Sequence, residues 1–162
     1  MSYTQGLLSL TQQVSTYLRA QKITVCTAES CTGGYLAQML TTLPGSSDWF
    51  DCGFVTYSNS SKQKLLNVPE NTILKHGAVS EQVAISMAQG ALDQSSADLA
   101  IAITGIAGPT GATADKSVGT VWFAWQLRER DAITRCEHFL GDRTAIREQA
   151  VAKALGMILQ IQ

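Results

Sequence analysis

Residues 27–34, Thr-Ala-Glu-Ser-Cys-Thr-Gly-Gly, gather reactive side chains where the local structure is expected to change. They follow a β-branched run at residues 23–25 and precede a helix-like apolar pattern at residues 35–40. Ser30 is therefore expected where a strand ends and a helix begins. The N–H groups at a helix start are unpaired and lie at the positive end of its dipole, so they can bind a phosphate or stabilise an oxyanion.

Ser30 can be interpreted in two ways. As a nucleophile it would use the turn beside it, because Gly33 and Gly34 let the backbone approach a ligand closely. As a structural residue, Ser30 or Thr32 would cap the following helix, and Glu29 would be a solvated neighbour. The choice depends on what the rest of the chain can bring to this turn.

A serine hydroxyl is a weak nucleophile at neutral pH and needs a neighbouring base. His76 falls in an expected loop and His138 in a late strand, and the Gly-x-Ser-x-Gly motif of α/β-hydrolases is absent. A lysine can be the base when burial lowers its pKa. Lys62 is the candidate because it closely follows the second expected strand, although a lysine on a short helix is otherwise a solvated residue. Lys64, two positions further on, should face away from it.

Two other side chains could belong to such a site. Cys31 could compete with Ser30 as the nucleophile, but no histidine lies near it in sequence, which favours a packing role. Arg143, which opens the last expected helix, could clamp an anion through two hydrogen bonds or be a surface cation. The glycine-rich loop at residues 105–111 lacks the ending of a P-loop, and the Rossmann spacing is absent too, so ATP and dinucleotide binding are not indicated.

The composition is that of a globular enzyme. The chain has 162 residues, 45% hydrophobic and 15% charged, with a net charge of -1, which favours one domain over residues 1–162 and gives no reason to expect nucleic acid or an acidic membrane as a partner. Its four cysteines have no Cys-x-x-Cys spacing, and there are only two histidines, so no metal site is predicted. No signal sequence or membrane span is evident, and a cytoplasmic protein with reduced thiols is expected.

Apolar periodicity predicts helices that alternate with strands in the first half of the chain. Ser80 and Asp142 are expected to cap helices. The expected helices lie at residues 7–18, 35–43, 62–66, 67–75, 80–92 and 143–158, and the expected strands at residues 23–27, 49–57, 99–104, 118–127 and 132–140.

This pattern predicts an α/β fold, a three-layer α/β/α sandwich around a mixed, mostly parallel sheet. Sites in such sheets lie beyond the carboxyl ends of strands. Three expected strands end in polar or glycine-rich turns, at residues 29–30, 57–59 and 104–105. If these strands are parallel, the three turns meet in one crevice.

Seven segments together resemble the competence-damage-inducible protein A C-terminal family. They occur in the family's order and cover nearly the whole chain, at residues 27–34, 44–47, 53–59, 76–80, 104–109, 118–121 and 141–143. One departure is the pair Ser60 and Ser61, where relatives often carry other small or acidic residues. The spacing from Asn59 to Lys62 is kept, so the match at Lys62 stands.

The resemblance implies a nicotinamide-nucleotide amidase of the serine–lysine type, which converts NMN and water to nicotinic acid mononucleotide and ammonia without metal or cofactor. Ser30 would be the nucleophile and Lys62 the base. Tyr57 would hydrogen-bond within this pair or border the pyridine ring. Backbone N–H groups of residues 31–34 would bind the oxyanion, and Arg143 or the 105–108 loop the phosphate. The implied substrate-binding residues are Glu29, Cys31, Thr32, Gly33, Gly34, Thr104, Gly105, Gly108 and Arg143.

A second hypothesis is a catalytically weak nucleotide-binding or regulatory module of the same fold, linked to competence or DNA-damage responses. The chain has no basic stripe or aromatic platform for nucleic acid. The resemblance also implies a homo-oligomer, with a dimer as the first choice. Trp122 and Trp125 are three residues apart in an expected strand, so they should lie on opposite faces of the sheet, where one could reach an interface but core packing is favoured.

Overall fold

Five strands form one mixed sheet in the computed structural model, which describes residues 3–161. The order across the sheet is β2-β1-β3-β4-β5, with β1 parallel to both β2 and β3, and with β4 antiparallel to β3 and β5. All strands but β4 therefore run in one direction, as predicted. Their bounds are β1 (Val25–Glu29), β2 (Phe50–Val55), β3 (Leu99–Gly105), β4 (Thr120–Leu127) and β5 (Ile133–His138).

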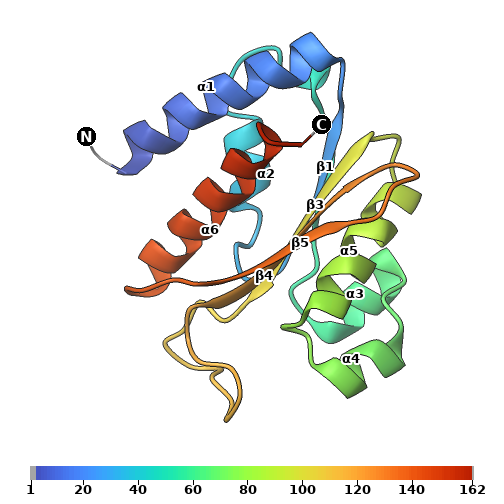
Figure 1. Ribbon diagram of the computed structural model, residues 1–162, viewed down its shortest axis with the longest axis vertical. Helices are drawn as coiled ribbons and strands as arrows, with labels where there is room; N and C mark the ends of the chain where they lie inside the picture. The colour runs from blue at the N-terminus through green and yellow to red at the C-terminus, as the bar shows by residue number, and fades with distance from the viewer. Residues whose placement is uncertain (1–2, 162) are drawn as a thin grey trace.

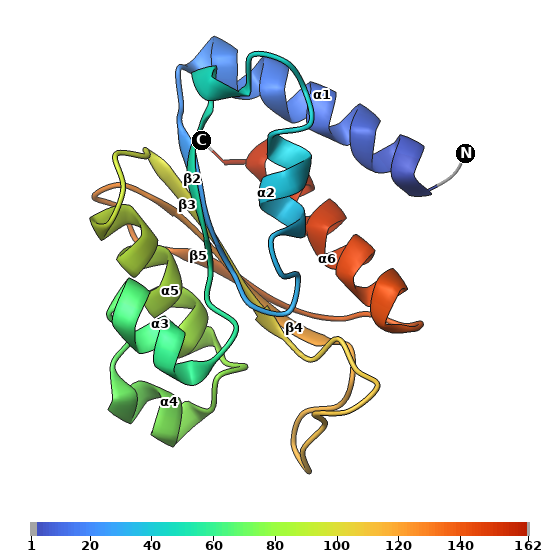
Figure 2. The same ribbon diagram turned by 180° about the vertical axis from the view of Figure 1, so that it is seen from behind.

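Helices cover both faces of the sheet and confirm the predicted three layers (Figures 1 and 2). One face carries α2 and α6, with α1 packed against both of them, and the other carries α5, with α3 and α4 packed against it. A short 3₁₀ helix, η1 (Ser46–Asp48), precedes β2. The helices are α1 (Tyr3–Gln21), α2 (Tyr35–Leu40), α3 (Asn59–Leu66), α4 (Glu70–His76), α5 (Glu81–Asp93) and α6 (Arg143–Ile158).

The central strand β3 is apolar because both of its faces are covered. Residues 99–104 are all buried, and side chains from this strand enter the core clusters on both sides of the sheet. The cluster under α5 is rich in alanine, which lets the helix lie close to the sheet. At Gly90 of α5, a Cβ atom would overlap the Leu66 carbonyl of α3. This glycine therefore allows the close approach of α3, the helix that carries Lys62.

The ends of several elements differ from the predictions because of contacts that only the folded chain makes. The first strand spans residues 25–29 instead of 23–27, since Ile23 closes the end of α1 through a hydrogen bond to Leu18. Helix α3 begins at Asn59 rather than Lys62, because Ser58 and Ser61 form a capping box. The predicted caps were right in two places: the side chain of Ser80 caps α5 and that of Asp142 caps α6.

The tryptophans of β4 lie on opposite faces, as predicted. Trp125 is 1% exposed and stacks on Phe123 in the core cluster beneath α6, and its indole N–H donates to the Ala154 carbonyl. Trp122 is partly buried against the other core cluster. Both indoles therefore pack within the chain. Among the described residues, no helix has the length and apolar character needed to cross a membrane.

Candidate active site

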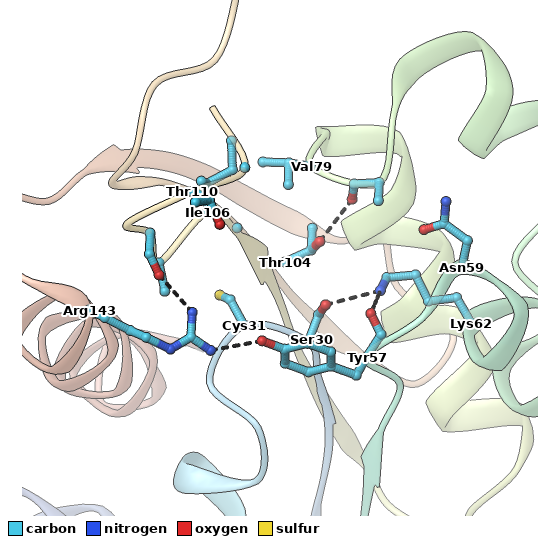
Figure 3. A pocket seen from close by; sticks show the side chains of 15 residues that line it. Ser30, Cys31, Tyr57, Asn59, Lys62, Val79, Thr104, Ile106, Thr110 and Arg143 are labelled. Carbon is cyan, nitrogen blue, oxygen red and sulfur yellow. Dashed lines mark hydrogen bonds between the residues drawn. The ribbon is translucent and has the colours of Figure 1, made fainter. Parts of the chain in front are cut away.

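The three predicted turns meet in one cavity of about 320 Å³ at the carboxyl ends of β1, β2 and β3 (Figure 3). The parallel pairing of these strands is the physical reason, because it places their carboxyl ends on the same edge of the sheet. The start of α6 and the loop after β3 complete the wall. The lining residues are Ser30, Cys31, Tyr57, Asn59, Lys62, Ala78, Val79, Thr104, Gly105, Ile106, Ala107, Gly108, Thr110, Gly111 and Arg143.

Lys62 lies in this cavity with its ammonium group next to Ser30. It is 1% exposed, although it is a lysine on the first turns of a helix. Its Nζ is 3.0 Å from Ser30 Oγ, 2.7 Å from the Thr56 carbonyl and 3.4 Å from the Tyr57 carbonyl (Figure 3). Lys64, by contrast, is exposed, as predicted. The capped helix thus aims one lysine inward and leaves its neighbour in solvent.

Burial lowers the pKa of Lys62 from its usual 10.5 to about 8. About a tenth of the Lys62 side chains are therefore neutral at pH 7, against well under a thousandth for a lysine with the usual pKa. The two carbonyls can accept both protons of a neutral amine, which leaves the nitrogen lone pair for the third neighbour, Ser30 Oγ. In that state the serine hydroxyl donates to Nζ. This is the geometry that general-base activation of a serine requires.

Glu29 does not line the cavity, contrary to its predicted place among the substrate-binding residues. It is fully buried, and its carboxylate accepts hydrogen bonds from the backbone N–H groups of Gly34, Leu36 and Ala37 at 2.8 to 3.1 Å. The positive end of α2 is thus satisfied by the chain's own carboxylate. The N–H groups of Gly34, Leu36 and Ala37 are therefore occupied, and Glu29 holds the start of α2 in place of contacting a ligand.

The turn after Ser30 offers fewer free donors than predicted. Thr32, Gly33 and Gly34 do not line the cavity, and the Gly33 N–H donates to the Ser30 carbonyl. Within residues 3–161, the N–H groups of Cys31 and Thr32 have no hydrogen-bond acceptor on another residue. Of the four backbone donors predicted at residues 31–34, these two are not used by the chain itself, and of the two residues Cys31 lines the cavity.

Cys31 lies next to Ser30 and lines the same cavity, but its thiol is poorly suited to attack. The residue is 6% exposed and belongs to the core cluster, and burial raises the pKa of its thiol from 9.0 to about 12. A thiol with this pKa is protonated near neutral pH, and only the thiolate is strongly nucleophilic. The structure therefore supports the packing role that the sequence favoured.

We expect Cys31→Ala to keep at least about a tenth of the wild-type kcat, because the change removes a protonated, buried thiol and leaves the backbone donors in place. A cavity cost of roughly 1–2 kcal/mol should lower the unfolding temperature. Steady-state kinetics and a thermal melt of the same preparation measure both effects. A loss of activity comparable to that of Ser30→Ala, in a folded variant, would transfer the nucleophile to Cys31.

Tyr57 and Arg143 form a bridge across the cavity (Figure 3). Arg143 Nη2 donates to the Tyr57 hydroxyl at 2.8 Å, and Nη1 donates to the Gly108 carbonyl at 2.9 Å. The phenol hydroxyl of Tyr57 therefore faces Arg143, so its predicted hydrogen bond within the serine–lysine pair is not made. Only its main-chain carbonyl contacts Lys62.

The far wall comes from the end of β3 and the loop behind it. The Thr104 hydroxyl donates to the Ala78 carbonyl at 2.8 Å, which joins this strand to the segment before α5. Gly105 has no room for a side chain, because a Cβ atom there would overlap Val121. Gly108 has a positive φ of 74°, which suits glycine, and directs its carbonyl to Arg143.

Several lining residues were not in the predicted site. Asn59 follows the second strand, and Ala78 and Val79 precede α5, in two of the segments that carried the family resemblance. Ile106 and Thr110 lie in the glycine-rich loop. The sequence does place these residues in polar or glycine-rich turns, which is the pattern that could have predicted them. Most of their side chains are apolar or amide groups, however, and carry no reactive group that would single them out. Neither histidine lines the cavity, as predicted.

Comparison with known proteins agrees with this arrangement. The chain is 52% identical to the nicotinamide-nucleotide amidohydrolase PncC of Escherichia coli strain K12 over 154 residues, which cover 95% of this chain and 93% of that protein. It is 44% identical to the protein of the same name from Pseudomonas putida, with 96% of each chain covered.

Solved structures and family models agree as well. The crystal structure of a CinA superfamily protein from Escherichia coli matches with a TM-score of 0.93 at 39% identity, covering 100% of this chain and 94% of that one. The model of the CinA C-terminal domain matches residues 7–162. By sequence and by structure, this chain belongs to the CinA C-terminal domain family.

Proposed function

We propose that this chain is a nicotinamide-nucleotide amidase that hydrolyses the carboxamide of NMN to nicotinic acid mononucleotide and ammonia, as a step of pyridine nucleotide salvage. The observation that carries the proposal is the 3.0 Å contact between Ser30 Oγ and the Nζ of a buried lysine with a lowered pKa. The names of the relatives supply the substrate class, since they are nicotinamide-nucleotide amidohydrolases at up to 52% identity.

In the first step, Ser30 Oγ attacks the carboxamide carbon of NMN while its proton passes to Lys62 Nζ. The carbonyl oxygen becomes negatively charged, and the N–H groups of Cys31 and Thr32 are the donors available to stabilise it. Lys62 then donates the proton to the amide nitrogen, the C–N bond breaks, and ammonia leaves. The Thr56 and Tyr57 carbonyls hold Nζ in place during both transfers.

In the second step, water hydrolyses the ester formed on Ser30. Lys62, neutral again after the loss of ammonia, accepts a proton from the water as it attacks the ester carbon. The resulting tetrahedral centre collapses, the bond to Oγ breaks, and the proton returns to the serine. In each step Lys62 first accepts a proton and then donates it, which a pKa near the working pH permits.

Arg143 is the proposed partner of the substrate phosphate. It lines the cavity on the side opposite Lys62, and its guanidinium is held by two neutral acceptors, the Tyr57 hydroxyl and the Gly108 carbonyl, rather than by a carboxylate. Its positive charge is therefore not neutralised by an ion pair within residues 3–161. A phosphate can then accept from the remaining guanidinium donors, with Tyr57 bordering the pyridine side.

We expect Arg143→Ala to raise the KM for NMN by about 10- to 100-fold, with a much smaller change in kcat, because a charge-assisted hydrogen bond is worth roughly 1.5–3 kcal/mol. The matched control is Arg135→Ala, since Arg135 is an exposed arginine on β5 outside the cavity. Initial rates over a range of NMN concentrations separate the two constants. An unchanged KM in Arg143→Ala would move the phosphate to the 105–108 loop.

The direct test of the function is to incubate the purified protein with NMN and assay both ammonia and nicotinic acid mononucleotide. Equal amounts of the two products are expected. A protein that gives no product but is thermally stabilised by NMN would instead be the binding module, because stabilisation follows ligand concentration relative to the dissociation constant.

A further inference from the structure

The turn at residues 31–34, here called the nucleophile turn, is held from two sides. Glu29 holds the C-terminal end of this turn, because its carboxylate accepts hydrogen bonds from the N–H groups of Gly34 and Leu36. Arg147 holds its middle from α6, with Nη2 donating to the Thr32 carbonyl at 2.8 Å. This hydrogen bond joins residues 115 positions apart. Arg147 itself does not line the cavity, so it acts on the site only through the turn.

The nucleophile turn has two internal hydrogen bonds, from the Gly33 N–H to the Ser30 carbonyl and from the Tyr35 N–H to the Thr32 carbonyl, and Arg147 adds a side-chain contact from outside the turn. Gly33 and Gly34 adopt positive φ values of 61° and 94°, and glycine restricts backbone rotation less than any other residue. The Thr32 carbonyl and the Thr32 N–H belong to the same residue and are linked through its backbone dihedrals. Fixing the carbonyl therefore restricts the directions open to the Thr32 N–H and, through the dihedrals of Cys31, to the Cys31 N–H.

Arg147 makes this contact at a cost that a simple packing residue would avoid. Its Nε is buried, and within residues 3–161 it has no hydrogen-bond partner. None of the ion pairs in the same range includes Arg147. Its guanidinium lies over the Tyr35 ring, 5.9 Å from the ring centre, in a cation–π contact. An unpaired buried donor is unfavourable, and such local costs are expected where a site needs a particular geometry.

We propose that Arg147 is a positioning residue for amide hydrolysis: it holds the Thr32 carbonyl so that the Cys31 and Thr32 N–H groups stay aimed at the developing oxyanion. The inference rests on the proposed function. Because the oxyanion exists only after Ser30 has attacked, Arg147 acts on the transition state and not on the bound substrate. Its loss therefore lowers kcat and leaves KM nearly unchanged.

The test compares Arg147→Met and Arg147→Lys with a matched control, Arg19→Met. Arg19 also contacts a ring and a backbone carbonyl, but away from the cavity: it lies 4.7 Å over the Trp49 ring and donates to the carbonyl of the left-handed Gly45. Unlike Arg147, it also forms an ion pair, with Asp48. Arg147→Met should lower kcat by about 10- to 100-fold with KM within about twofold, as a small displacement of catalytic groups does. Arg147→Lys keeps a donor and should be intermediate, and Arg19→Met should keep the wild-type kcat.

A second readout separates positioning from general destabilisation. Pyridine-3-boronic acid can accept Ser30 Oγ at boron, with the serine proton passing to Lys62, to give a tetrahedral boronate anion that resembles the oxyanion intermediate. Inhibition of the wild type by this compound should weaken in Arg147→Met by about the same factor as kcat. A variant that is only less stable would lose active protein but keep the inhibition constant of the wild type.

The outcomes are distinct. A wild type that releases no ammonia from NMN would reject the proposed function itself. With an active wild type, the inference is overturned if folded Arg147→Met keeps kcat within twofold, if only KM changes, or if boronate inhibition is unaffected. If Arg147→Met does not fold, Arg147→Lys decides the matter by the same three criteria.

Discussion

Ser30→Ala should lower kcat for ammonia release from NMN by about 10⁴-fold or more, because removing the nucleophile removes the covalent route altogether. Ser30 is 8% exposed and its hydroxyl contacts Lys62 Nζ, so the substitution deletes one small polar group at the cavity wall. NMN should still bind, since the phosphate and ring contacts are untouched. Product assays and NMN-dependent thermal shifts on one preparation measure both properties.

The same variant can report on the intermediate. Hydroxylamine attacks an ester on serine and converts it to a hydroxamate, so wild-type enzyme turning over NMN in its presence should form the hydroxamate of the nucleotide. Ser30→Ala should form none. Full activity in a folded Ser30→Ala would remove the assignment of the nucleophile, and hydroxamate formation by this variant would do the same.

Lys62→Met should reduce kcat by about 10²- to 10⁴-fold, the range expected for loss of a general acid–base group. Methionine is one atom shorter but fills most of the buried volume, and it has no proton to exchange. In the wild type, kcat/KM should rise with pH and level off above about 8, because Ser30 is activated only by the neutral amine. The variant should lose this rise. Lys64→Met, two positions away on the exposed side of α3, should keep both the rate and the pH profile.

The lowered pKa of Lys62 also has a consequence for stability. The unfolded chain binds a proton at this lysine up to pH 10.5 and the folded chain only up to about 8, so folding releases a proton between these values. The free energy of unfolding of the wild type, relative to Lys62→Met, should therefore rise with pH in this window, by about 2–3 kcal/mol between pH 7 and pH 10. Urea unfolding at the two pH values checks this. A difference in unfolding free energy that stays the same at both pH values would contradict the burial of a titrating lysine. In the kinetic test, residual activity above a few per cent in Lys62→Met would argue against Lys62 as the base.

Much of the fold follows from local patterns in the sequence. The apolar run at residues 99–104 predicted a doubly covered strand, and the caps at Ser80 and Asp142 marked two helix starts, because these signals depend on neighbouring residues alone. The difference between Lys62 and Lys64 was also predictable. Two positions along a helix correspond to about 200° of rotation, so the two side chains must face different surroundings.

Sequence reasoning failed where the partner of a group lies far along the chain or where two local interpretations compete. Glu29 was predicted beside the ligand and instead satisfies the start of α2. The helix start and the carboxylate were both recognised, but their distance was not known. Tyr57 was predicted either to hydrogen-bond within the serine–lysine pair or to border the pyridine ring; the first is not made, because its hydroxyl meets Arg143, 86 residues later. These contacts depend on how α2 and α6 pack in the folded chain, and a local sequence pattern does not predict that packing.

The sequence by itself determined the alternation of helices and strands and the three strand ends that carry polar turns. It also placed a serine in one of those turns and a lysine just after another. Tertiary structure decided which groups meet and in what state. Parallel pairing of β1 with β2 and β3 brought the turns to one edge, and the close approach of α3 at Gly90 accompanied the burial of Lys62. The physical reason is that residue type and spacing are local properties, whereas desolvation and the distance between two side chains arise only from packing, and it is these that set the pKa of Lys62 and its contact with Ser30.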